Sequence, residues 1–195
     1  AESKKQLLDL VKSSITSKTK MVLLSHVETV TGLRWPIKEV SEILKGKDIL
    51  FIVDGAQAPG MLHIDLHDLG CDVYACSGHK WIMGPKETGV LYMKKSIQEK
   101  VNNVFITGGY TAYSRSSGTR NAPIIIGFGD VLDWHMAIGT KRSEKRCMEL
   151  AAYCYDELSK VSGIKVISSK DPELGSAIVS FSLPETSDNG ELFRS

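Results

Sequence analysis

The chain has 195 residues, of which 42% are hydrophobic and 24% are charged, the proportions of an ordinary globular protein. The formal net charge is only +1, which gives no electrostatic reason to expect nucleic acid or an anionic membrane surface as a partner. No apolar run approaches the roughly 20 residues of a membrane span, and no signal-peptide core follows the amino terminus. The 4 cysteines form no C-x-x-C pair, so we expect reduced thiols and a cytoplasmic protein.

Apolar periodicity predicts alternating helices and strands along the first hundred residues. Leucines at helical spacing near the start predict a first helix, and Pro36 can open a second helix. The run 49–53 is apolar at every position, which is typical of a parallel strand that is covered on both faces. In all, four short apolar runs predict strands, at 21–24, 49–53, 73–76 and 89–93. A short helix is expected over 96–101.

The second half of the chain is dominated by helical patterns. Long helices are predicted over 124–139 and 143–160, followed by strands over 163–168 and 177–183. We interpret the basic stretch from Lys141 to Arg146 as a solvated helix face. The alternation along the whole chain favours an α/β fold with three α/β/α layers around a mostly parallel sheet.

Polar side chains follow each of the first three predicted strands. Ligands of open parallel sheets bind at the carboxyl ends of the strands, so these three loops should face one crevice. The candidate site residues on them are Thr29 after the first strand, Asp54 and Gln57 after the second, and Ser77, His79 and Lys80 after the third.

These residue types suit one cofactor, pyridoxal 5'-phosphate. Its aldehyde needs an amine with which to form a Schiff base, and Lys80 could supply it. Its pyridine nitrogen needs an anionic partner so that the ring can accept electrons, and Asp54 could serve. Its phosphate needs hydroxyl, imidazole or backbone N–H donors, which Ser77 and His79 could provide.

Each residue also has an ordinary structural explanation. A lone lysine such as Lys80 is usually a solvated surface residue, and a lone Asp54 could be a turn or cap residue. His79 could be a packed histidine, and His26 is better explained as structural than as catalytic. A non-catalytic α/β binding domain is a further alternative. A nucleotide-binding domain is disfavoured because the sequence has neither a G-x-G-x-x-G motif after a strand nor a Walker motif.

Several runs together resemble the class V aminotransferases, a pyridoxal-phosphate-dependent group that includes cysteine desulfurases, selenocysteine lyases and isopenicillin N epimerase. The resemblance covers residues 21–183 and is carried by Asp54-Gly55-Ala56-Gln57-Ala58, Ser77-Gly78-His79-Lys80 and Gly89-Val90-Leu91-Tyr92. It implies the fold of type I pyridoxal-phosphate enzymes. It also implies catalysis through an internal aldimine on Lys80, with Asp54 at the pyridinium nitrogen. Gln57 would bond the ring hydroxyl, and Ser77 and His79 would bind the phosphate.

Two positions differ from the desulfurase pattern and are more similar to the isopenicillin N epimerase-like branch. Thr29 stands where desulfurases have Asn, and Arg120 stands where they more often have Pro. The preceding Gly118-Thr119 matches a Gly-Thr that, in the family, reaches the partner's phosphate across a dimer interface. Arg120 itself could form an interface ion pair or contact the anion of a substrate. The resemblance thus implies a homodimer with shared sites.

The expected activity is therefore chemistry at Cα of an amino-acid substrate. Epimerisation, elimination and transamination stay open, and a cysteine desulfurase or selenocysteine lyase is the alternative. We expect residues 1–160 to form part of the cofactor-binding large domain and residues 161–195 to begin a small C-terminal α+β domain. The ring-stacking residue, the arginine that clamps the substrate carboxylate and any catalytic cysteine would lie outside this chain. No metal site is expected.

Overall fold

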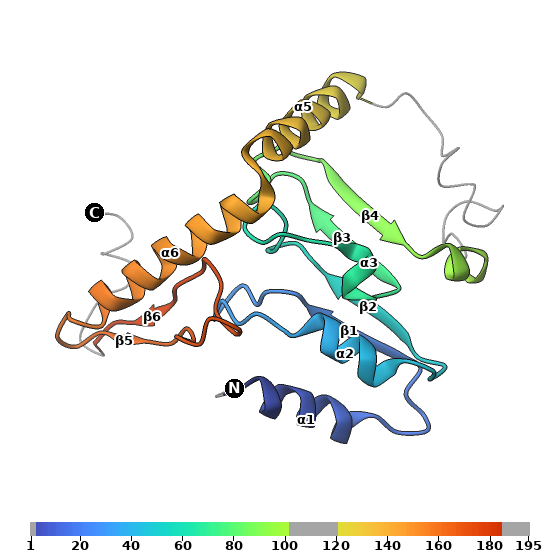
Figure 1. Cartoon of the computed structure of the whole chain (residues 1–195), viewed down its shortest axis with the longest axis horizontal. Coiled ribbons are helices and arrows are strands. Elements are labelled where there is room, and N and C mark those ends of the chain that lie inside the picture. The colour runs from blue at the N-terminus through green and yellow to red at the C-terminus, as the bar shows by residue number, and fades with distance from the viewer. Residues whose placement is uncertain (1–2, 102–120, 185–195) are drawn as a thin grey trace.

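The fold is known from a computed structural model, which describes residues 3–101 and 121–184 (Figure 1). Helices and strands alternate in the first half: α1 (Lys4–Ser14), β1 (Met21–Ser25), α2 (Ile37–Leu44), β2 (Leu50–Asp54), α3 (Leu66–Leu69), β3 (Val73–Ser77) and β4 (Gly89–Met93). The later elements are a 3-10 helix η1 (Lys95–Lys100), then α5 (Ala122–Ile138), α6 (Thr140–Leu158), β5 (Lys165–Val166) and β6 (Phe181–Ser182).

The central sheet has the strand order β1-β2-β3-β4. Its first three strands are parallel, and β4 runs antiparallel to β3. Ser25 pairs with Asp54, and Asp54 pairs with Ala75, so the carboxyl ends of the parallel strands lie side by side. The predicted α/β class with a mostly parallel sheet is confirmed.

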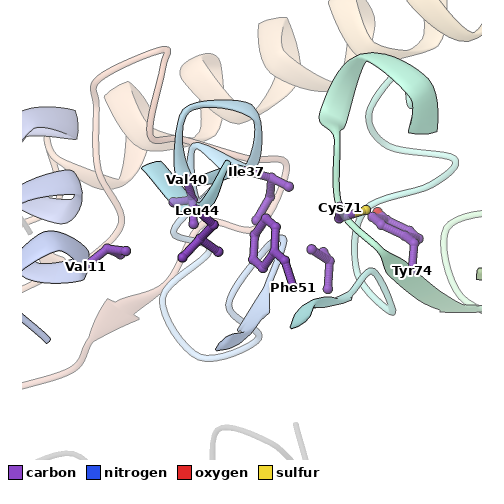
Figure 2. Close-up of a cluster of buried hydrophobic side chains, with 8 residues drawn as sticks. Val11, Ile37, Val40, Leu44, Phe51, Cys71 and Tyr74 are labelled. Carbon is purple, nitrogen blue, oxygen red and sulfur yellow. The ribbon is translucent and has the colours of Figure 1, made fainter. Parts of the chain in front are cut away.

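One face of the sheet packs against α1 and α2, and the main core lies between them (Figure 2). Alternation along β2 directs Phe51 and Val53 into this core, where they are 2% and 0% exposed. Burying side chains of this size stabilises the fold by about 1.5–3 kcal/mol each. On the opposite face, Leu23 and Leu91 stay 61% and 59% exposed.

Gly139 separates the two long helices, which form an elbow (Figure 1). Its φ of 89° lies in the left-handed region that favours glycine, so one residue ends α5 and begins α6. Beyond α6, the short β5–β6 pair forms a separate sheet. Within the residues described, no helix is long and apolar enough to cross a membrane.

The segment around β5 and β6 packs back onto the loop that follows β1. The Arg34 N–H donates to the Leu174 carbonyl at 2.8 Å, and the Ser168 hydroxyl donates to the Thr31 carbonyl at 2.7 Å. Leu174 is fully buried. The division into a large and a small domain at residue 160 stays a prediction.

Candidate active site

Asp54 is the last residue of β2 and is exposed at the edge where the parallel strands end. Its Oδ1 accepts a hydrogen bond from the Ala56 N–H at 2.9 Å, which fixes the orientation of the carboxylate. The backbone carbonyl of Asp54 also accepts from the His26 N–H at 2.7 Å. One carboxylate oxygen is therefore held by the chain, and the other has no partner among the residues described.

Gln57 joins the three loops that the sequence predicts to converge. Its Oε1 accepts from the indole Nε1–H of Trp81 at 3.1 Å, and its Nε2 donates to the Thr29 hydroxyl at 3.2 Å. Because the indole nitrogen can only donate, the amide oxygen must face Trp81. The second Nε2–H has no partner in the described structure, so it remains available to a ligand.

Glycine packing anchors the loop that carries Lys80. A Cβ on Gly78 would lie 2.2 Å from Thr88 Oγ1, and one on Gly84 would lie 2.7 Å from Cδ2 of Phe128. Phe128 comes from α5, so this helix packs directly against the loop. The turn is closed by two bonds of 2.8 Å, from the Met83 N–H to the Lys80 carbonyl and from the Gly84 N–H to the Gly78 carbonyl. Lys80 is exposed, and in the described part of the chain its ammonium group has no partner.

A buried pair of rings lies beneath the turn that follows Asp54. Nδ1 of His26 and the Tyr74 hydroxyl are 3.0 Å apart in a hydrogen bond, and both residues are at most 3% exposed. Burial, with a smaller effect of the Arg34 charge, lowers the pKa of His26 to about 3. Burial also raises the pKa of Tyr74, so both rings are neutral at pH 7. Gly55 lies directly on the Tyr74 ring.

The structure thus gathers most of the predicted residues at one edge of the sheet. Thr29, Gln57 and the loop of Lys80 are connected by the two bonds of Gln57. Ser77 ends β3 and is half-buried, and His79 is exposed two residues later. The predicted residues Thr119 and Arg120 lie outside the described residues.

Three residues of this site were not singled out from the sequence as site residues. Trp81 follows Lys80 directly, and that adjacency was the only signal for its role. Tyr74 lies within the predicted strand 73–76, and its position beneath Gly55 depends on the packing of β3 against the turn. His26 was expected to be structural, and it is buried.

The free groups at this edge fit a cofactor that has an aldehyde, a ring nitrogen, a ring hydroxyl and a phosphate. Lys80 supplies an amine, Asp54 an anionic oxygen, Gln57 an amide N–H, and Ser77 and His79 a hydroxyl and an imidazole. A metal ion would need a different ligand set. No group of three or more His, Cys, Asp or Glu side chains that could hold one occurs among residues 3–101 and 121–184.

The α/β fold, with parallel strands that end beside these free groups, is that of the type I pyridoxal-phosphate class. The model of the aminotransferase class-V family matches residues 1–191. The chain therefore belongs to the class V aminotransferase family, whose members are pyridoxal-phosphate-dependent enzymes.

Both branches that the sequence indicates occur among the chain's relatives. The chain is 35% identical over 188 residues to a probable cysteine desulfurase of Halalkalibacterium halodurans, with 90% of this chain and 45% of that protein covered. It is 28% identical to the isopenicillin N epimerase of Amycolatopsis lactamdurans, with coverage of 96% and 52%. The crystal structure of the Escherichia coli cysteine desulfurase CsdA superposes with a TM-score of 0.77 at 26% identity, covering 92% of this chain and 47% of that one. The chain thus spans about half the length of these relatives.

Proposed function

We propose that this protein binds pyridoxal 5'-phosphate at the carboxyl ends of β1, β2 and β3 and acts at Cα of an amino-acid substrate. The single observation that carries the proposal is the hydrogen-bonded connection from Thr29 through Gln57 to Trp81, because it joins the three loops next to Asp54 and Lys80. When bound, the cofactor supplies an aldehyde for covalent attachment and a protonated ring that accepts electrons from Cα.

The residues of the chain divide the work between holding the cofactor and moving protons. Lys80 would hold the cofactor through its amine, and the same amine, when free, would move protons at Cα of the substrate. Asp54 would keep the ring nitrogen protonated by charge. Gln57 would offer its free Nε2–H to the ring hydroxyl. Ser77 and His79 would bind the phosphate.

Reduction with borohydride tests the assignment of Lys80. Treatment of the cofactor-loaded protein, followed by peptide mapping, should place a phosphopyridoxyl group on Lys80. The variant Lys80→Ala should lose the near-violet absorbance, whereas Lys86→Ala serves as a matched control on the same loop. Lys94 is a poor candidate because its ammonium donates to the Gly70 carbonyl at 2.6 Å and pairs with Asp72 at 3.2 Å. Label on Lys86 or Lys94 would refute the assignment.

The reaction we favour is epimerase-like or lyase-like, with cysteine desulfurisation as the second candidate. Thr29 in place of Asn and Arg120 in place of Pro favour the first. The 35% identity to a probable cysteine desulfurase favours the second. Incubation with free L-cysteine discriminates between them, because efficient release of alanine and sulfide would reverse this order.

We also propose a cytoplasmic homodimer in which Thr119 serves the partner's site and Arg120 lies near the site mouth. The support is the family pattern of Gly118-Thr119. A mixed dimer of Lys80→Ala and Thr119→Ala chains tests it. If the sites are shared, one site carries both lesions and the other none, so activity per dimer should recover to about half of the wild-type value. An inactive mixed dimer, or a fully active monomer by light scattering, would contradict the proposal.

A further inference from the structure

A large cavity lies inside the elbow between α5 and α6, beside the loop of Lys80. We call it the elbow pocket. Its volume of about 670 Å³ is in the range of small-molecule sites. Its apolar wall comes from two segments: Trp81 and Met83 on the loop, and Trp134 and Ile138 on α5. Lys80 lines the same pocket, so a molecule bound there lies beside the residue to which we assign the chemistry.

The charged residues at the elbow pocket are all cations. Arg142 and Arg146 line it together with Lys80, and none of the described residues that line it is acidic. Arg146 pairs with Glu149 at 3.3 Å, but Arg142 has no hydrogen-bond or ion-pair partner among the residues described. Both arginines are exposed, as expected of a solvated helix face, and they also line the elbow pocket.

The start of α6 adds to this positive character. The helix begins at Gly139 without a side-chain cap and has no acidic residue in its first turn. The partial positive charge of a helix amino terminus is normally balanced by an acidic or capping side chain. Here its first turn instead carries Lys141 and Arg142. A bound anion would balance both the positive charge of Arg142 and the partial positive charge of the helix amino terminus.

One wall of the pocket includes a strained backbone position. Met83 has a φ of 60°, a left-handed conformation that costs a non-glycine residue about 1 kcal/mol or more. The Met83 side chain is nevertheless 60% exposed and lines the pocket. The loop therefore keeps a strained residue whose large apolar side chain is exposed beside Lys80. Packing into the protein core does not explain this conformation, because the side chain is not buried there.

We propose that the elbow pocket binds the side chain of the amino-acid substrate, and that the preferred substrates have an extended apolar side chain that ends in an acid group. The apolar wall would cover the chain, and Arg142 would pair with the terminal acid. This inference rests on the proposed function, because that chemistry places the substrate's amino group at Lys80.

The pocket can be tested separately from the chemistry, because two of the 3 tryptophans of the chain line it. A Trp35→Phe background removes the third. In cofactor-free protein, octanoate should change the fluorescence of Trp81 and Trp134 and should bind at least about tenfold more tightly than octanol, as expected for a charge-assisted hydrogen bond. Affinity should rise about fourfold per methylene from butanoate to octanoate. Octylammonium should not bind.

Two charge-removing variants on α6 provide the matched comparison. Arg142→Gln should abolish the preference for octanoate over octanol. Lys145→Gln should leave it unchanged, because Lys145 is exposed and does not line the pocket. In the loaded enzyme, Arg142→Gln should lower kcat/KM for L-2-aminosuberate about tenfold and leave that for L-2-aminooctanoate unchanged.

The outcomes separate this proposal from the proposed function. Equal binding of octanol and octanoate, or no fluorescence change with either, would overturn the elbow pocket proposal even if Lys80 is labelled. Octanoate binding without cofactor attachment at Lys80 would refute the proposed function, and with it the assignment of the pocket to a substrate. Unchanged selectivity in Arg142→Gln would refute the role of this arginine.

Discussion

Replacing Gly55 by alanine should disrupt the turn that positions Asp54. A Cβ at this position would lie 2.0 Å from Cε1, 2.2 Å from Cζ and 2.4 Å from the hydroxyl oxygen of Tyr74. Ordinary contacts are at 3.5–4 Å or so, so the ring or the turn must move by more than about 1 Å. The ring has little freedom, because Tyr74 is 2% exposed and bonded to His26.

The expected loss has two parts. Overpacking of a well-packed core costs roughly 1–3 kcal/mol, and loss of the bond between Tyr74 and His26 costs about 1 kcal/mol more. We therefore expect Gly55→Ala to lower the free energy of unfolding by about 2–4 kcal/mol. Urea denaturation followed by circular dichroism measures this directly. Cofactor affinity should also fall, because the displaced turn carries Asp54.

A glycine with open space around it supplies the control. Gly129 lies within α5, and a Cβ there would meet nothing within 4 Å. Gly129→Ala should therefore stabilise the protein by about 0.5–1 kcal/mol, the ordinary helix preference of alanine over glycine. In a double-mutant cycle, Gly55→Ala should be clearly less damaging in a Tyr74→Leu background. Additive changes in the free energy of unfolding for the two substitutions, or an unchanged urea denaturation midpoint for Gly55→Ala, would refute the packing argument.

Three further changes test other parts of the site. Asp54→Asn should keep the fold but lower kcat by about 10²–10³, because electrostatic contributions of this kind are worth ~3–4 kcal/mol; near-normal turnover would refute the charge role. Trp81→Phe should weaken cofactor binding about tenfold in an absorbance titration, because Gln57 loses the donor that orients it. Trp35→Phe should not, since its indole nitrogen has no partner among the described residues. The pKa of His26 falls from 6.5 to about 3 on folding, so the neutral ring contributes fully to the free energy of unfolding above pH 6.5. Between pH 6.5 and about 3, acidification should lower the free energy of unfolding by up to ~1.4 kcal/mol per pH unit. His26→Gln should lose this pH dependence when the free energy of unfolding is measured by urea titration at pH 7 and pH 5. An equal change between the two pH values in wild type and variant would contradict the role of His26.

The sequence predicted the sheet well because its strands are set by local patterns. The prediction of 49–53 differs by one residue from β2 (Leu50–Asp54), and that of 124–139 differs by a residue or two from α5 (Ala122–Ile138). The prediction was less accurate for short helices and strands. The four-residue α3 was missed, since it depends on a cap in which Asp65 accepts two N–H bonds and has too few residues for a periodic pattern. The predicted strands 163–168 and 177–183 pair only over β5 and β6.

Candidate site residues were predictable where they follow a strand, and unpredictable where they depend on packing. Asp54 and Lys80 could be proposed because Asp54 ends one strand of the parallel sheet and Lys80 follows the next. The contact of Trp81 with Gln57 joins residues 24 positions apart through the tertiary structure, so periodicity cannot indicate it. The same holds for Arg142, whose basic neighbours suggest a solvated surface until the elbow at Gly139 brings it to the pocket.

The site combines two side chains that are held in fixed orientations with one side chain that is free to move. In the proposed function, Asp54 and Gln57 would hold fixed positions relative to a cofactor ring. Each is oriented by a donor of the chain: the Ala56 N–H at 2.9 Å and the Trp81 indole at 3.1 Å. Orientation before binding reduces the free energy that would otherwise be spent on ordering these side chains. The role proposed for Lys80 has the opposite requirement, because an amine that moves protons at Cα of the substrate needs a mobile side chain. In the described residues its backbone is fixed through the turn from Gly78 to Gly84, while its side chain has no partner. A rigid loop that carries a free amine is the arrangement that this division of roles requires.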